Sequence, residues 1–162
     1  MAPPVEVRDF LGTPNCTRNQ MISTHELSMR YGKDAGAVEV LRGVSIEVAT
    51  GERVAIVGPS GCGKTTLLLL LAGLDRPSGG SVAIAGTPLE TLNADHLADL
   101  RRDQLGIVFQ AFHLVPSLSA LENVALPLEI AGRTGARERA RDLLDRGGLS
   151  ARDPLSISTI WR

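Results

Sequence analysis

Hydrophobic and polar positions along the chain change their period several times, and each change predicts a new element. Two segments rich in β-branched residues show partial alternation and are interrupted by glycines, which is typical of antiparallel strands. These predicted strands are Ile22–Arg30 and Val38–Val48. Short, almost wholly apolar runs are typical of strands buried on both faces of a parallel sheet. Such runs occupy Arg53–Val57 and Ile107–Phe109, and a further strand is predicted at Ser81–Ala85.

Helices are predicted between and after these strands. The expected helices are a Leu-rich helix ended by the turn Asp75–Gly80, a helix at Asn93–Arg102, a helix from Ser119 to about Ala131, and a charged helix at Ala136–Arg146. Asn93 is a candidate N-cap, and Ser119 and Glu122 have the spacing of a capping box. Pro127 is expected to kink the third helix or end it early. The order of elements predicts an α/β fold with a parallel core sheet and an antiparallel β region near the N-terminus.

The two ends of the chain show no hydrophobic period. Residues 1–20 contain three prolines and no apolar run, so we expect a disordered leader, with Met21 as an alternative start. We expect one domain over residues 21–149. The segment 150–162 is predicted to be an atypical tail of the kind that a frameshift or truncation leaves.

Charge and composition exclude several classes of function. The 162 residues include 17 Lys+Arg and 18 Asp+Glu, so the positive excess that nucleic-acid binding requires is absent. The longest strongly apolar stretch, Leu67–Leu74, is far shorter than the roughly 20 residues of a membrane-spanning helix. No apolar run typical of a secretory signal occurs near the start, which favours a cytosolic location. Cys16 and Cys62 lack the spacing of metal ligands.

The strongest chemical signal is the run Gly58-Pro59-Ser60-Gly61-Cys62-Gly63-Lys64-Thr65, which matches G-x-x-x-x-G-K-[ST] in full. Its glycines let backbone N–H groups surround phosphate oxygens, and the helix that begins near Lys64 adds its positive dipole end. Lys64 is expected to reach the β and γ phosphates. We expect Thr65 to offer its hydroxyl to Mg²⁺ and Thr66 to lie near the α phosphate. Cys62 is interpreted as a small tolerated side chain, with a reactive thiol as the alternative.

Three segments together resemble one known family. The glycine loop, the turn Asp75–Gly80 and the run Ile107-Val108-Phe109-Gln110 fall where ABC transporter ATP-binding domains have their Walker A motif, the following turn and the Q loop. The chain is therefore similar to the amino-terminal portion of such a domain, from about Ile22 to Leu149. The segments most similar to the lipoprotein-release and macrolide-exporter group are Leu41–Ser45, Leu100–Arg102 and Phe112–Val124.

The resemblance implies cofactors, partners and further site residues. Tyr31 matches the family's A-loop aromatic, which stacks on adenine; the alternative is a tyrosine that covers a sheet edge. Gln110 matches the glutamine that contacts Mg²⁺ and the attacking water; the alternative is a polar residue that ends a strand. The stretch Phe112–Leu128 corresponds to the surface that receives the transmembrane permease subunit; the alternative is that its apolar residues are ordinary core. ATP, Mg²⁺, a second ATP-binding subunit and a peripheral location at the inner face of the plasma membrane are also implied.

Phosphoryl transfer to water requires more groups than a phosphate loop. The family takes them from a Walker B Asp with an adjacent Glu, a switch His and a Leu-Ser-Gly-Gly-Gln signature. In this sequence no Asp is followed by Glu and no His follows His113, while Ser78–Gly80 lacks the signature's flanking residues. We therefore expect ATP binding without efficient hydrolysis. The leading hypothesis is a truncated ATP-binding subunit of an ABC exporter. The alternatives are a nucleotide-binding or interaction module without turnover and another P-loop class such as a kinase or GTPase.

Overall fold

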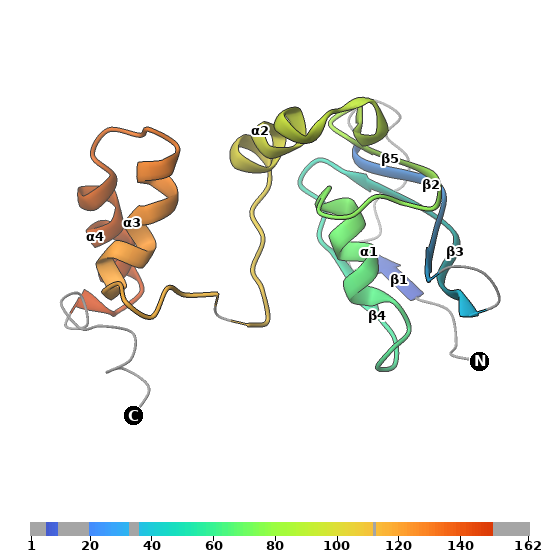
Figure 1. Cartoon of the computed structure of the whole chain (residues 1–162), viewed down its shortest axis with the longest axis horizontal. Helices are drawn as coiled ribbons and strands as arrows, with labels where there is room; N and C mark the ends of the chain where they lie inside the picture. The colour runs from blue at the N-terminus through green and yellow to red at the C-terminus, as the bar shows by residue number, and fades with distance from the viewer. Residues whose placement is uncertain (1–5, 10–19, 33–35, 112, 151–162) are drawn as a thin grey trace. The chain divides into compact units, whose positions relative to one another are not determined.

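The computed structural model describes residues 6–9, 20–32, 36–111 and 113–150. The chain divides into two compact units, Met1–Gly106 and Ile107–Arg162 (Figure 1). Most of the predicted leader and almost all of the predicted tail lie outside the described residues. Among the described residues, no helix has both the length and the apolar character needed to cross a membrane.

The first unit contains a four-stranded antiparallel sheet with the strand order β3-β2-β5-β6. Its strands are β2 (Gln20–Tyr31), β3 (Val38–Ala49), β5 (Gly79–Ile84) and β6 (Thr87–Pro88). The predicted antiparallel region is therefore confirmed. Thr24 shows how the central strands are joined, because its buried hydroxyl donates to the Val44 carbonyl at 3.0 Å and accepts from the Ile46 N–H at 3.0 Å.

The strand that leads into the glycine loop pairs in an unexpected way. β4 (Val54–Val57) is half-buried and pairs antiparallel with β1 (Glu6–Asp9), a strand in a segment where the sequence predicted no element. Figure 1 shows β1 beside β4. No parallel pair occurs among the described strands, so the α/β class is confirmed but the parallel pairing expected around β4 is not seen.

The described part of the first unit also contains two α-helices and a short 3-10 helix between them. They are α1 (Lys64–Leu71), η2 (Leu89–Thr91) and α2 (Ala94–Gln104). The core is aliphatic, and its most deeply buried side chains are Leu27, Leu41, Leu67, Leu70, Val82 and Ile84. The prediction for α2 is confirmed, since the Asn93 side chain accepts from the His96 N–H and Leu97 and Leu100 are buried.

The second unit contains α3 (Ala120–Ile130) and α4 (Ala136–Arg146), which pack through small residues and leucines. The predicted capping box at Ser119 and Glu122 is present in full. Pro127 lies inside α3 without ending it, because the helix continues to Ile130. Ala125 and Ala140 are fully buried between the helices.

The prediction of a buried strand at Ile107–Phe109 is wrong. These residues have no regular structure, and all three side chains are exposed, with Val108 fully so. An apolar run becomes a buried strand only when neighbouring strands cover it and pair with its backbone. No described strand pairs with this segment.

Candidate functional site

The glycine loop joins β4 to α1 (Figure 1). Its last glycine, Gly63, lies close to β3. Gly61 and Gly63 have φ angles of +79° and +101°, a conformation that L side chains rarely adopt. A Cβ at Gly63 would also lie 3.0 Å from both the Val40 carbonyl oxygen and Leu41 Cδ2. The loop therefore requires glycine here for its backbone conformation and for its close approach to β3.

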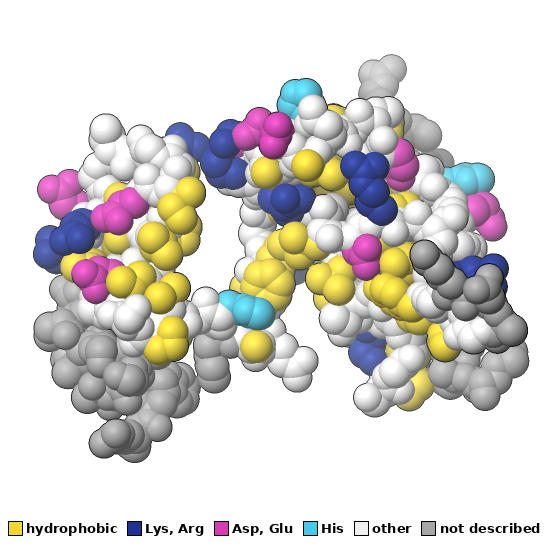
Figure 2. All heavy atoms as spheres, in the orientation of Figure 1, with side chains coloured by type: hydrophobic (Ala, Val, Ile, Leu, Met, Phe, Trp, Pro, Cys, Tyr) yellow, Lys and Arg dark blue, Asp and Glu magenta, His cyan; other side chains and the backbone are white. Residues whose placement is uncertain are grey.

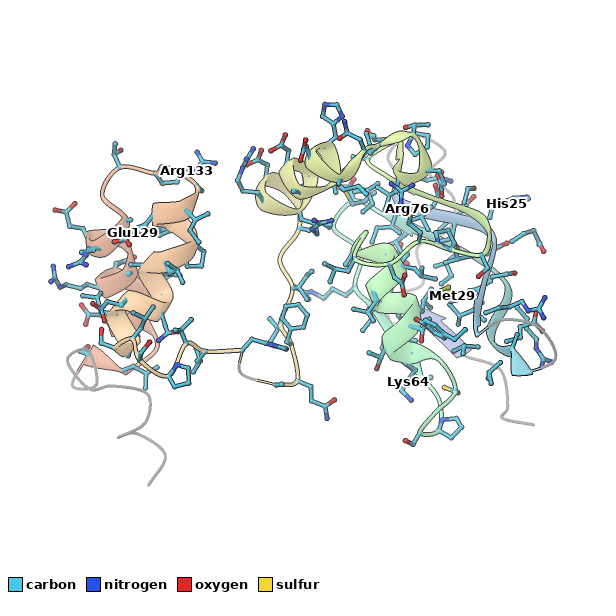
Figure 3. The ribbon with its side chains drawn as sticks, viewed as in Figure 1. His25, Met29, Lys64, Arg76, Glu129 and Arg133 are labelled. Carbon is cyan, nitrogen blue, oxygen red and sulfur yellow. The ribbon has the colours of Figure 1, made fainter. Side chains whose placement is uncertain are left out.

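The ammonium of Lys64 lies within the glycine loop and bonds to its backbone. Its Nζ atom donates to the carbonyl oxygens of Gly58 at 2.8 Å and Pro59 at 2.7 Å, and it lies 3.7 Å from Cys62 Sγ. Figure 3 shows Lys64 at the end of α1 that adjoins the loop. A compact positive charge is thus held within the turn, as phosphate binding requires.

The N-terminus of α1 is open to an anion. Gly63 is its N-cap residue, no side chain caps the helix, and its first turn contains no acidic residue. Unpaired N–H groups and the helix dipole make such an end electropositive. Thr65 is exposed and Thr66 is half-buried in this first turn.

Cys62 packs beneath the loop. Its side chain is buried, with a relative exposure of 5%, and a Cβ added at Gly58 would lie 2.7 Å from its Sγ atom. Ser60, by contrast, is exposed. The packing of Cys62 supports its interpretation as a small side chain that fits under the turn.

The structure brings Tyr31 to α1. Its hydroxyl donates to Asp75 Oδ2 at 3.0 Å and also interacts with the Thr66 side chain. Partial burial raises the pKa of Tyr31, the hydrogen bond to Asp75 raises it further, and the interaction with Thr66 opposes this. The predicted adenine-stacking ring and the predicted α-phosphate residue therefore meet in one place.

Gln110 belongs to the second unit, where it is an exposed residue at a bend. In the same segment the rings of Phe109 and His113 make an edge contact with centroids 4.8 Å apart. Phe112, the first residue of the predicted docking stretch, lies outside the described residues. The structure thus places Tyr31 and the glycine loop in one unit and Gln110 in the other.

Sequence reasoning treated Asp75 only as a turn former and missed its hydrogen bond with Tyr31. The partner of Asp75 lies 44 positions earlier in the sequence, and no local pattern connects the two residues. A cavity of about 290 Å³ also opens near the C-terminal end of α1, over Leu70, Val82 and Leu97. Asp75 lines this cavity, but none of the glycine-loop residues does.

A comparison with family models identifies the class of protein. The ABC transporter model matches residues 41–159, and the chain belongs to that family. The match extends into the segment 150–162, which the sequence had led us to treat as atypical.

Curated relatives include exporters of the predicted group. An ABC transporter ATP-binding protein of Mycobacterium tuberculosis is 49% identical over 81% of this chain and 40% of its own length. The pyoverdine export ATP-binding/permease protein PvdT of Pseudomonas putida is 53% identical over 75% of this chain and 19% of its own length. The macrolide export ATP-binding/permease protein MacB 1 of Aeromonas hydrophila is 46% identical over 83% of this chain and 21% of its own length. The chain thus spans less than half of each relative.

Two solved dimeric structures of a bacterial ABC transporter cassette share the fold. The one described as a post-hydrolysis state bound to ADP and Pi has a TM-score of 0.72 at 33% identity, covering 85% of this chain and 63% of its own. The other has a TM-score of 0.73 at 37% identity, covering 82% of this chain and 60% of its own. These matches confirm the predicted resemblance and the α/β cassette fold.

Proposed function

We propose that this chain binds ATP through its glycine loop, as the ATP-binding part of an ABC exporter. The observation that carries the proposal is the Lys64 ammonium, held on two loop carbonyls beside the uncapped N-terminus of α1. A strand-to-helix turn without a ligand has no need of a positive charge at this point. The cassette structure described with bound ADP and Pi supports the same ligand class.

The loop, the first turn of α1 and Tyr31 contact different parts of the nucleotide. Lys64 binds the β and γ phosphates as a compact charge, and Thr66 lies near the α phosphate. The ring of Tyr31 stacks on the adenine. The backbone N–H groups that surround the phosphates belong to Gly58, Ser60, Gly61, Cys62 and Gly63. Pro59 has no N–H group, and its carbonyl instead accepts a hydrogen bond from Lys64.

Mg²⁺ fits the donors that the site offers. Thr65 presents an exposed hydroxyl, and the hard Mg²⁺ ion prefers oxygen ligands together with phosphate and water. The described residues contain no group of three or more His, Cys, Asp or Glu that would form a closed metal site. When bound, the ion neutralises charge on the phosphates. We propose that the exposed amide of Gln110 contacts the ion and the attacking water.

Hydrolysis and export are proposed for an assembly that includes partners. We propose a transmembrane permease subunit and a second ATP-binding subunit, since the exporters PvdT and MacB 1 are ATP-binding/permease proteins and the cassette structures are dimeric. The second unit exposes Leu114 and Val115 in the stretch proposed to meet the permease. Figure 2 shows hydrophobic side chains reaching its surface between charged ones. Such docking would hold the chain at the inner face of the membrane.

Calorimetric titration of the full chain tests ATP binding. The expected order of affinity is ATP, then ADP, with adenosine far weaker, because the phosphate contacts dominate. Inorganic tripolyphosphate should compete with ATP. Failure to bind both ATP and tripolyphosphate would overturn the proposal, whereas binding of adenosine as tightly as ATP would exclude the loop as the main contact.

A further inference from the structure

We propose that Asp75 is a positioning residue that holds the Tyr31 ring in the orientation in which it stacks on the nucleotide base. This inference rests on the proposed function. It adds a residue that the glycine loop and its sequence motif do not include. The direct observation is the 3.0 Å hydrogen bond from the Tyr31 hydroxyl to Asp75 Oδ2.

The Asp75 carboxylate is itself held in place. Its Oδ1 atom accepts from the backbone N–H of Arg76 at 2.9 Å, which leaves Oδ2 to receive the Tyr31 hydroxyl. A carboxylate that is fixed by a backbone donor presents its second oxygen in a defined direction. Charge-assisted hydrogen bonds of this kind are stronger than those between neutral groups.

The turn that carries Asp75 is also fixed to the strand that carries Tyr31. The Ser78 N–H donates to the Ser28 carbonyl at 2.9 Å, and the Ser78 hydroxyl accepts from the Arg30 N–H at 3.1 Å. Both ends of the Tyr31–Asp75 bond therefore start from backbone that is held together. The bond adds a restraint on the side chain alone.

That restraint matters because Tyr31 is largely open to solvent, with a relative exposure of 42%. An exposed aromatic side chain loses rotamer freedom when a base stacks on it, and this loss weakens binding. The bond to Asp75 and the interaction with Thr66 restrict the ring before the base arrives. We therefore expect Asp75 to increase affinity for the base without touching the nucleotide.

The test compares two ligands, ATP and inorganic tripolyphosphate, which differ by the adenosine. Asp75→Ala should weaken ATP binding about 2- to 10-fold, the range of one net hydrogen bond, and leave tripolyphosphate binding unchanged. Tyr31→Phe should have a similar effect, and the double variant should be no worse than either single one. Asp75→Asn retains an acceptor oxygen and should restore most of the affinity. Asp99→Asn, which removes an exposed charge on α2, is the matched control.

A spectroscopic readout follows the bond itself. Tyr31 is the single tyrosine of the chain, so phenolate absorbance reports its pKa directly. Asp75→Asn should lower that pKa toward the ordinary value of 10.0, because it removes a negative charge. Unchanged ATP affinity in Asp75→Ala, or equal weakening of ATP and tripolyphosphate, would overturn the positioning role. Lack of binding by the wild-type chain to either ligand would instead overturn the proposed function.

Discussion

The Nζ atom of Lys64 lies 2.7 Å from the carbonyl oxygen of Pro59, inside the turn that precedes α1. The side chain thus reaches back over the loop and does not extend into solvent. The same ammonium also bonds to Gly58, so two carbonyls fix the charge at the N-terminus of α1. A charge held in this way binds phosphate with little further loss of side-chain freedom.

Replacement of Lys64 by alanine should therefore weaken ATP binding strongly. Loss of charge-assisted bonds to phosphate is expected to cost roughly 1.5 to 3 kcal/mol, about 10- to 150-fold in affinity, measured by calorimetry. Arg102→Ala is the control, because it removes one exposed positive charge from the same unit. Equal effects of the two variants would mean that net charge, and not the loop, determines affinity.

Gly80 and Gly86 offer a matched pair of substitutions in the first unit. Both have a φ of +78°, but a Cβ at Gly80 would clash with the backbone of His25 and Glu26, whereas nothing lies within 4 Å at Gly86. Gly86→Ala should cost about 1 to 2 kcal/mol for its backbone conformation alone. Gly80→Ala should cost about 3 kcal/mol or more, because it also displaces strand β2.

Urea unfolding followed by circular dichroism measures the difference between these two variants. The larger loss of stability in Gly80→Ala comes from the β2–β5 contact. This variant should therefore lower the urea concentration at the unfolding midpoint without changing the dependence of the unfolding free energy on urea. Similar losses at Gly80 and Gly86 would contradict the close approach of the two strands.

Local patterns predicted most of the elements because their causes are local. The strands β2 and β3, the N-cap Asn93 and the capping box at Ser119 follow from residues close together in the sequence. Burial at Ile107–Phe109 depends instead on strands that must come from elsewhere, and the apolar pattern alone does not contain that information.

The candidate site shows the same division. The glycine loop and its lysine were predicted because one contiguous motif contains them. The partner of Tyr31 was not predicted, because its bond to Asp75 depends on how a strand end meets the turn after a helix. Contacts of this kind follow from packing and have no fixed spacing.

The capping box of α3 should make the second unit sensitive to acid. Hydrogen bonds from the Ser119 backbone N–H and hydroxyl lower the pKa of Glu122, and the charge of Arg137 lowers it further. A lowered pKa means that the folded unit binds this proton more weakly than the unfolded chain does. The ionised Glu122 side chain therefore stabilises the folded unit in full well above pH 4.5, the ordinary pKa of a glutamate. This stabilisation is lost as the pH falls through the lowered pKa.

Thermal unfolding between pH 6 and pH 3 checks this prediction. Glu122→Gln should remove part of the acid sensitivity, and Ser119→Ala should cost about 1 kcal/mol at neutral pH. Asp145→Asn removes an exposed carboxylate from α4 of the same unit and is the control. Acid sensitivity that is identical in Glu122→Gln and the wild type would show that other carboxylates determine it.

Asn123 should determine the shape of the turn before α3. Its Oδ1 atom accepts from the Val115 N–H at 2.8 Å, and its Nδ2 atom donates to the carbonyls of Val115, Leu118 and Ser119 at 3.1, 3.2 and 2.9 Å. Asn123→Ala removes all four bonds, while Asn123→Asp retains an acceptor for the Val115 N–H and loses the donor. Because one net hydrogen bond contributes about 0.5 to 1.5 kcal/mol, amide exchange at Val115 should accelerate about 2- to 12-fold in the alanine variant. In the aspartate variant, the exchange rate at Val115 should lie between those of the wild type and the alanine variant.

The Leu97 amide is the control for this measurement. Leu97 in α2 belongs to the other unit, and its amide should exchange at the same rate in all three proteins. Since Val115 lies in the stretch proposed to meet the permease, unchanged exchange there would also remove Asn123 from any role in shaping that surface.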